Sequence, residues 1–378
     1  MMLKVNQLRC LVCVVALASA GHAGAQAYVF TDLGTLGGSV SEALGINDAG
    51  LVVGYSSLAG NSVQHATLWN GSGISDLGSL GGVSSPFSSQ AYGINNSGQI
   101  AGYSFTAGGN AFHATIWNNG NAADLGTLGG SSSQAFAINN AGQVAGYAYT
   151  SNNYGQAAIW NNGAATSLGT LGGTFSQANA ISDTGQAVGM SYTSGNSTLH
   201  AASWQNGTAT DLGTLGGFAS FALGVNNSAQ VVGYSNITGN SSVHATLWSN
   251  GAVTDLGTLG GTFSEALGIN NAAQIVGYAY TAGNVARHAA LWNNGGLVDL
   301  NSYLDASAAN AGWVLVSANA VNNNGWIAGQ AQNTLTGASD AFLLVAVPEP
   351  DGYTLLLAGL GVMGSIVLRR RSKTVGWF

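Results

Sequence analysis

Between residues 28 and 347 the chain alternates short apolar segments with turns rich in glycine, asparagine and aspartate. In the first stretch the apolar segments are Ala43 to Asn47, Leu51 to Tyr55, His65 to Trp69 and Ile74 to Leu77. Asn-Gly, Asp-x-Gly and Gly-Gly sequences supply the positive φ angles that tight hairpins need. No segment of this span keeps a 3.6-residue apolar period. The pattern therefore predicts strands and very few helices.

This pattern of four strands recurs with a period of about 44 residues. The third strand ends in a tryptophan at Trp69, Trp117, Trp160, Trp204, Trp248 and Trp292. An Asn-rich element starts seven times, at Ile46, Ile94, Ile138, Ile181, Val225, Ile269 and Val321. A four-stranded unit of this length is typical of a β-propeller blade. Both faces of the strands are apolar or small, as expected for sheets packed between neighbouring sheets.

The phase of the repeat predicts how the two ends of this region meet. The seventh unit has three strands and no fourth, whereas Tyr28 to Leu33 precede the first unit as an unmatched strand. Adding that strand to the last unit would remove the free sheet edges of an open array. We therefore expect residues 26–347 to form an all-β, seven-bladed β-propeller closed by its N-terminal strand.

The charge of the repeats excludes two classes of partner. Residues 28–347 contain a single basic residue, Arg287, against twelve acidic residues. Such a surface cannot neutralise a phosphate backbone, so we expect no nucleic-acid binding. It is equally unsuited to anionic membrane surfaces.

The two ends of the chain have the composition of targeting segments. Basic residues precede the apolar run Leu11 to Ala20, and small residues follow it, so residues 1–25 are predicted to be a cleaved signal peptide. Its removal takes away Cys10 and Cys13 and leaves no disulfide. At the other end, residues 348–378 contain an apolar stretch at 352–368, predicted to be a transmembrane helix with its basic end in the cytoplasm.

The tail has three features in order: a Pro-Glu-Pro motif, the apolar stretch and an Arg-rich end. The motif residues are Pro348, Glu349, Pro350, Arg369, Arg370 and Arg371. This arrangement resembles the PEP-CTERM sorting signal of Gram-negative bacteria, which exosortase recognises. The repeats resemble the HAF family of extracellular repeats, through His65-Ala66-Thr67 and Asp340-Ala341-Phe342 among others. Together the resemblances imply tethering to the inner membrane and sorting to the cell surface or to the exopolysaccharide matrix of a biofilm.

Two recurring polar residues are candidate metal ligands. One repeat position holds His65, His113, His200, His244 and His288, with Gln156 and Asp340 at the equivalent places. Imidazoles brought together around a ring would bind a metal, but equivalent positions on different blades lie far apart outside the central channel. We therefore expect each histidine to bond within its own blade.

The aspartates of the Asp-Leu-Gly element form the second series: Asp76, Asp124, Asp211 and Asp255. Carboxylates at tight turns accept backbone N–H bonds, and calcium is the functional alternative. Ser167 interrupts the series without visible compensation. We expect a structural role and no cofactor, with calcium kept as the alternative.

Catalytic constellations are nearly absent. Glu42 and Glu265 are the only glutamates in the repeats, and they occupy equivalent positions in units one and six. A glycosidase pair must approach within about 5 to 10 Å, a poor match to two separate blades. We expect no enzyme activity, with a glycan hydrolase or lyase as the alternative.

One unit departs from the pattern. Residues 301–313 replace the usual short link, and their Tyr303 and Trp313 would either stack on sugar rings or fill the seam beside the closing blade. Tyr92, Phe87 and the extra residues 83–88 form a second candidate. The sequence thus predicts an exported binding or scaffold protein that engages extracellular polysaccharide.

Overall fold

The computed structural model describes residues 28–81 and 88–347. Their secondary structure is almost entirely β, which confirms the predicted all-β class. The helical segments of this part of the chain are η1 (Ser194–Asn196), η2 (Ala282–Asn284), η3 (Leu300–Tyr303) and α1 (Ala306–Asn310). Within these residues no helix has the length and apolar character needed to span a membrane. The signal peptide predicted at 1–25, the tail at 348–378 and its helix at 352–368 lie outside the described residues.

The strands pair antiparallel in groups of four, in chain order. Group one contains β2 (Gly37–Ile46), β3 (Val52–Leu58), β4 (Gln64–Trp69) and β5 (Ile74–Asp76). Group two contains β6 (Ser89–Ile94), β7 (Ile100–Phe105), β8 (Phe112–Asn118) and β9 (Asn121–Asp124). Group three contains β10 (Gly129–Ile138), β11 (Val144–Thr150), β12 (Gly155–Asn161) and β13 (Ala164–Gly169).

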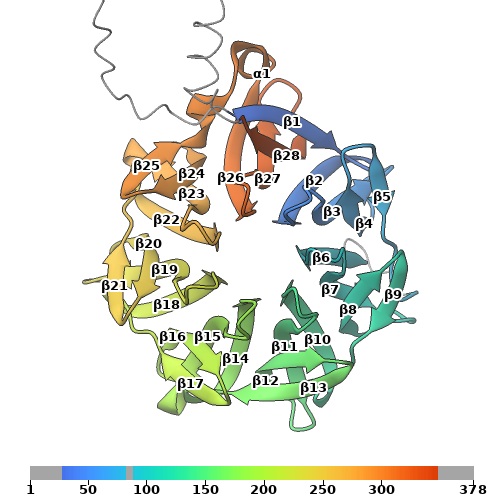
Figure 1. Cartoon of the computed structure of the whole chain (residues 1–378), viewed down its shortest axis with the longest axis vertical. Helices are drawn as coiled ribbons and strands as arrows, with labels where there is room; N and C mark the ends of the chain where they lie inside the picture. The colour runs from blue at the N-terminus through green and yellow to red at the C-terminus, as the bar shows by residue number, and fades with distance from the viewer. Residues whose placement is uncertain (1–27, 82–87, 348–378) are drawn as a thin grey trace, which may run out of the picture. The chain divides into compact units, whose positions relative to one another are not determined.

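Group four contains β14 (Gly172–Ile181), β15 (Ala187–Thr193), β16 (Leu199–Gln205) and β17 (Thr208–Asp211). Group five contains β18 (Gly216–Val225), β19 (Val231–Ile237), β20 (Val243–Ser249) and β21 (Ala252–Asp255). Group six contains β22 (Gly260–Ile269), β23 (Ile275–Thr281), β24 (Arg287–Asn293) and β25 (Gly296–Asp299). Group seven combines β26 (Trp313–Val321), β27 (Ile327–Asn333) and β28 (Ser339–Ala346) with β1 (Tyr28–Gly34). The groups surround a common centre, with the first strand of each innermost, as in a β-propeller (Figure 1).

The first strand of a group is longer than the apolar pattern predicts. In group one it begins at Gly37 instead of Ala43, so the Gly-Gly pair is part of the strand. Gly37 has a φ of +100°, and a Cβ on Gly38 would lie 2.5 Å from the Cβ of Ser57. The two glycines therefore allow an irregular strand start and a close approach of β3, which side-chain hydrophobicity does not report.

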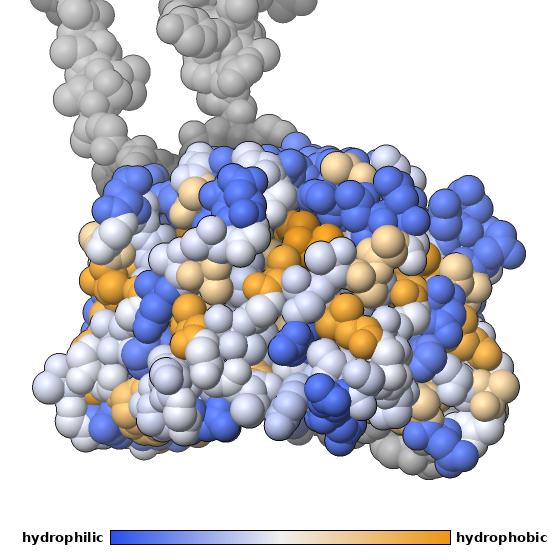
Figure 2. Space-filling view, turned by 90° about the horizontal axis from the view of Figure 1, so that it is seen from below, coloured by the Kyte–Doolittle hydropathy of each residue, from blue (hydrophilic) through white to orange (hydrophobic). Residues whose placement is uncertain are grey.

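The hydrophobic core lies between neighbouring groups. One cluster, for example, joins Ala145 and Ala157 of group three to Ala178, Ile181 and Trp204 of group four. The alanines are fully buried and let the sheets approach closely, while the tryptophan supplies most of the buried surface. On the side seen in Figure 2, apolar residues form small separate patches between neutral and hydrophilic ones.

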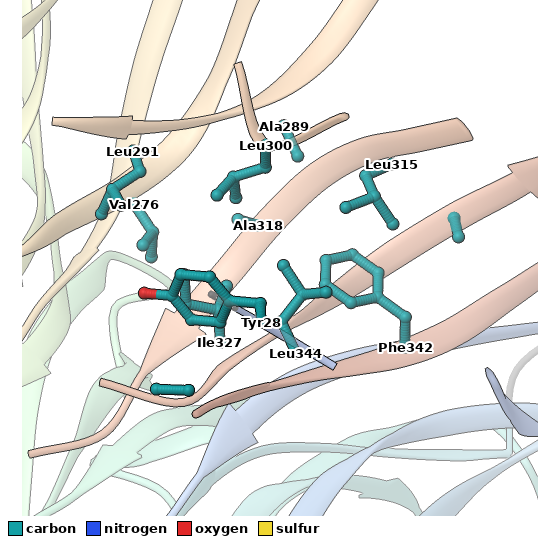
Figure 3. Packing of buried hydrophobic residues seen from close by; sticks show 12 residues of the cluster. Tyr28, Val276, Ala289, Leu291, Leu300, Leu315, Ala318, Ile327, Phe342 and Leu344 are labelled. Carbon is teal, nitrogen blue, oxygen red and sulfur yellow. The ribbon is translucent and has the colours of Figure 1, made fainter. Parts of the chain in front are cut away.

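The N-terminal strand pairs with the C-terminal one. β1 runs antiparallel to β28, with Tyr28 opposite Ala346 and Thr31 opposite Leu343. Figure 3 shows Tyr28 inside the apolar cluster that also contains Leu315 of β26 and Phe342 of β28. The last group is therefore completed by residues from the other end of the region.

Candidate functional site

The innermost strands line two cavities around the common centre. A smaller cavity of about 150 Å³ is bordered by asparagines and aspartates, and a larger one of about 540 Å³ is bordered mainly by apolar side chains. Six isoleucines and valines, including Ile46 and Val225, line both cavities. These side chains therefore lie between the two cavities.

A first ring of asparagines borders the smaller cavity and connects the groups. The Asn47 side-chain amide donates to the backbone carbonyl of Asn95 at 3.1 Å. The same bond recurs from Asn95, Asn139, Asn226, Asn270 and Asn322 to the next group. The last of these runs from Asn322 to Asn47 and thus joins group seven to group one. Ser182 replaces the asparagine in group four and carries no amide donor.

The next residue of each turn forms a second ring. Each backbone N–H donates to the side-chain Oδ1 of the equivalent residue in the following group, at 2.9 to 3.1 Å. The residues are Asp48, Asn96, Asn140, Asp183, Asn227, Asn271 and Asn323. The cycle returns from Asn323 to Asp48.

The two carboxylates of this ring are stabilised by their neighbours. Asp48 accepts from the amides of Asn96 and Asn323 at 2.9 and 3.0 Å. Burial alone would raise its pKa, but the bonds from Asn323 and Asn96 hold the pKa below its ordinary value. Asp183 has a lowered pKa in the same way, through bonds from Asn140 and Asn227. Both carboxylates are therefore negative at neutral pH, on an otherwise uncharged ring.

The larger cavity contains the mixture of side chains that a small polar ligand requires. Its wall includes two aromatic rings, one carboxylate and two amides, from Tyr92, Phe136, Glu42, Asn179 and Asn319. All five side chains are half-buried. Apolar rings beside a few oriented polar groups are typical of small-molecule sites.

Hydrogen bonds hold the carboxylate of this wall in place. Glu42 accepts from the Tyr55 hydroxyl at 2.6 Å and from the Asn319 amide at 2.9 Å. Asn319 comes from group seven, so this contact also crosses between the two ends of the chain. Burial, followed by the charge of Glu42, raises the pKa of Tyr55 well above its usual range, so the phenol stays protonated and donates.

Aromatic side chains continue outward from Tyr92 across three groups. Tyr92 lies 5.2 Å from Phe136, and Phe136 lies 6.0 Å from Tyr147, between ring centroids. The series extends from Tyr147 to Phe175 at 6.2 Å. Burial raises the pKa of Tyr147 to about 12. The series is therefore uncharged at neutral pH.

The recurring histidines and aspartates lie elsewhere, on the outer strands, and contact each other. Each histidine Nδ1 lies 2.6 to 2.9 Å from the aspartate on the adjacent strand of its own group. The pairs are His65–Asp76, His113–Asp124, His200–Asp211, His244–Asp255 and His288–Asp299. The aspartates of the first four pairs also accept the N–H of a glycine two residues later. Within the described residues no group of three or more His, Cys, Asp or Glu side chains could hold a metal ion.

Two groups carry other residues at this pair of positions. In group three the Ser167 hydroxyl donates to Gln156 at 2.6 Å, which is the compensation that the sequence did not reveal. In group seven Asp340 occupies the histidine position, and its Oδ1 is buried without a hydrogen-bond partner among the described residues. Burial and then the charge of Asp32 raise the pKa of Asp340 to about 6.

The two aromatic residues of the insertion pack beside β1. Tyr303 lies 5.0 Å from Tyr28, and Trp313 lies 5.9 Å from Phe30, between ring centroids. Both are half-buried against the cluster of Figure 3. The insertion is held by its own caps, because Asp299 accepts from Asn301 and Asp305 accepts from Ala308. Phe87, proposed with Tyr92, lies outside the described residues.

The sequence analysis missed most of the wall of the larger cavity. Leu44, Tyr92, Phe136, Asn179, Leu223, Leu267 and Asn319 occupy one repeat position and all line the larger cavity. The sequence does carry one indication of this wall. The residue type at this position differs from unit to unit, while the residues on either side of it are always alanine or glycine. Its importance depends on which strand is innermost, and that requires the tertiary arrangement.

Comparison with known families identifies one end of the chain. A family model described as the PEP-CTERM protein-sorting motif matches residues 346–371. The chain carries an export and surface-sorting signal. This agrees with the signal expected from Pro348, Glu349, Pro350 and the terminal arginines, and it implies recognition by exosortase-type machinery. No curated protein matches the chain.

Solved structures show similarity in fold at low sequence identity. The β-propeller domain of the Trilobed protease from Pyrococcus furiosus, described as having an open velcro topology, is 8% identical with a TM-score of 0.50. That match covers 86% of this chain and 99% of the other. TolB from Acinetobacter baumannii is 12% identical, with a TM-score of 0.41 and coverage of 65% and 63%. A mutant of the Aleuria aurantia lectin, in complex with alpha-methyl-L-fucoside, is 10% identical, with a TM-score of 0.35 and coverage of 72% and 96%. The first of these supports the propeller fold alone.

Proposed function

We propose that this chain is an exported, surface-displayed protein that binds extracellular saccharide on a closed, seven-bladed propeller. The pairing of β1 with β28 supports closure. So do the bonds from Asn322 and Asn323 to Asn47 and Asp48, which complete both rings across the chain ends. The repeats belong, in this proposal, to the HAF type of extracellular repeat.

The observation that carries the binding role is the composition of the larger cavity. The face of a sugar ring presents C–H groups that pack on aromatic rings such as those of Tyr92 and Phe136. Its hydroxyls require fixed donors and acceptors: Glu42 offers carboxylate oxygens and Asn179 keeps one amide hydrogen beside its bond to Ala222. Asn319 donates both of its amide hydrogens, to Glu42 and to Ala43, and so fixes the Glu42 carboxylate. A volume of about 540 Å³ is within the range of small-molecule sites.

The sorting signal supports the place where this binding would occur. A protein sorted to the cell surface through residues 346–371 would meet extracellular polysaccharide as a candidate ligand. We propose that the tail first tethers the protein to the inner membrane, that the mature protein contributes to an exopolysaccharide or biofilm matrix, and that it performs no catalysis.

A glycan array tests the proposal with the full-length chain in detergent. We expect binding to neutral glycans, and at least a tenfold loss of affinity in Tyr92→Ala because a stacking surface is removed. Tyr234→Ala is the matched control, since Tyr234 packs on Phe221 at 4.7 Å outside the cavity wall. The control should keep the binding of the unchanged protein.

A product assay on the bound glycans separates binding from the enzyme alternative. Release of shorter saccharides that stops in Glu42→Gln would replace the binding proposal with a hydrolase or lyase. Equal binding by the Tyr92 and Tyr234 variants would remove the cavity from the proposal, and absence of any glycan binding would refute it.

A further inference from the structure

Arg287, the single Lys or Arg of residues 28–347, occupies a repeat position that is uncharged in the other groups. Arg287 is the first residue of β24, opposite Tyr280 of β23. The equivalent residues of the other groups are uncharged: Gln64, Phe112, Gly155, Leu199, Val243 and Ser339. Arginine is therefore not required by the repeat, and its presence in group six needs a separate explanation.

The guanidinium of Arg287 has no counter-ion in direct contact among the described residues. Its Cζ lies 5.0 Å from the centroid of the Tyr278 ring, in a cation–π arrangement. Within residues 28–81 and 88–347 it makes no ion pair. Its charge acts on Glu265: burial raises the pKa of Glu265, and the bond from Tyr278 and the charge of Arg287 oppose that rise. A half-buried guanidinium is thus oriented by an aromatic ring, and its N–H donors are not used by this part of the chain.

Arg287 also lines a groove between two groups. A cavity of about 620 Å³ is lined by polar side chains from both groups, Arg287 and His288 of group six and Gln330, Gln332, Thr334 and Ser339 of group seven, and by the apolar Val285, Ala286, Val314 and Val316. Groups six and seven are neighbours in Figure 1. Planar guanidinium donors match the two oxygens of a carboxylate, and amide and hydroxyl side chains suit the hydroxyls beside it.

The charge of the whole region limits which anion would be accepted. Twelve acidic residues lie in the span that contains Arg287. Charges within a Debye length of about 8 Å at physiological salt are only partly screened, so a densely charged polymer would be repelled along the rest of the surface. One carboxylate on an otherwise neutral saccharide would gain the arginine contact without that repulsion.

We propose that the groove between groups six and seven binds the carboxylate of an acidic sugar carried by a sparsely charged saccharide, with Arg287 as the carboxylate-binding residue. The inference rests on the proposed function in taking saccharide as the ligand. The site is separate from the larger cavity at the common centre, because the two have no lining residue in common.

Methyl β-D-glucuronide and its neutral counterpart methyl β-D-glucoside are suitable probes, titrated into the full-length protein and followed by ligand-observed NMR. At pH 7 we expect the glucuronide to bind about tenfold more tightly than the glucoside, the difference that one charge-assisted contact provides. Arg287→Gln should abolish the difference, and Arg287→Lys should retain part of it, since lysine keeps the charge without the planar donors. Val243→Gln, at the equivalent position of group five, should leave the difference unchanged.

The outcomes distinguish this inference from the proposed function. Equal binding of the two probes to the unchanged protein, or an unchanged preference in Arg287→Gln, would overturn the groove assignment. Loss of glycan binding in Tyr92→Ala would still support the proposed function in either case. If Arg287→Gln proves unstable, the graded result of Arg287→Lys still decides, because a preference equal to that of the unchanged protein would show that guanidinium geometry is not used.

Discussion

At the scale of single residues, one pair of positions on the outer strands is occupied by three different combinations of side chains. Five groups use histidine and aspartate, group three uses Gln156 and Ser167, and group seven uses Asp340 beside Asp32. The His–Asp pairs are partly exposed, with aspartate side chains 31 to 42% accessible. Solvent-exposed pairs contribute about 0 to 1 kcal/mol. Recurrence at this position therefore reflects a hydrogen bond between neighbouring strands.

The buried tryptophans offer a sharper comparison at this scale. The Trp292 indole N–H donates to the Leu256 carbonyl at 2.9 Å, whereas the Trp160 indole N–H is buried without a partner among the described residues. We expect Trp292→Phe to reduce the free energy of unfolding by about 1 kcal/mol more than Trp160→Phe, because only the former leaves a carbonyl unsatisfied. Urea denaturation of the two variants measures the difference. An equal loss in both would mean that the indole bond contributes nothing beyond packing.

At the scale of elements, the turns after the innermost strands connect neighbouring groups. Asn139 shows the full set of contacts: its amide donates to the Ser182 carbonyl at 3.0 Å and to Gln143 at 2.8 Å. In group four Ser182 has no amide, and the Oε1 of Gln186 is buried without a partner in the described part of the chain. A single departure from the repeat thus explains one unsatisfied acceptor.

Ser182→Asn should therefore stabilise the protein. The new amide can donate to the Asn226 carbonyl and to Gln186, as its equivalents do in other groups. We expect a gain of about 1 to 2 kcal/mol in the free energy of unfolding, since a buried unsatisfied group costs about 1 to 3 kcal/mol. Thermal unfolding followed by circular dichroism is the measurement.

Asn139→Ser is the reverse control for the turn and should lower the melting temperature. A lower melting temperature for Ser182→Asn as well would show that group four has adapted to serine.

At the scale of the whole repeat region, contacts between strands join the two ends of that region. β1 holds β28 through backbone pairing, and Tyr28 enters the apolar cluster of group seven. The same group contains the exceptional acidic pair. Asp340 is 9% exposed, Ala331 lies opposite it on β27, and Ser41 of β2 accepts from the N–H of the next residue, Ala341. Asp32 is thus the charge that it meets.

This pair predicts that Asp340 contributes less to stability as pH rises through 6. The folded pKa of Asp340 is about 6 and its ordinary value is 3.8, so the folded state binds more protons between these pH values. The contribution of Asp340 to the free energy of unfolding should then fall from pH 4 to pH 7. Asp340→Asn removes the titration and should be more stable than the unchanged protein at pH 7.5, by on the order of 1 to 3 kcal/mol.

Melting temperatures of both proteins between pH 4 and pH 8 test this expectation. The two curves should approach each other near pH 4. Parallel curves over the whole range would show that Asp340 does not titrate in this interval.

Local sequence patterns were sufficient to predict the all-β class, the period of the repeat and the sorting signal, because strand spacing, turn residues and a linear motif are local properties of a chain. The unmatched strand at Tyr28 could be predicted from phase alone. Local pattern also located Glu42 and Tyr92, although it suggested neither that they line the same cavity nor that Asn319 joins them.

The remaining features depend on how the groups are arranged in space. Which strand faces the centre selects Phe136 and Asn179 for the cavity wall, and whether Arg287 has a counter-ion depends on residues far away in sequence. The pairing of His65 with Asp76 likewise follows from strand register. These properties arise from contacts between strands and between groups, where side-chain spacing along the chain carries no information about distance.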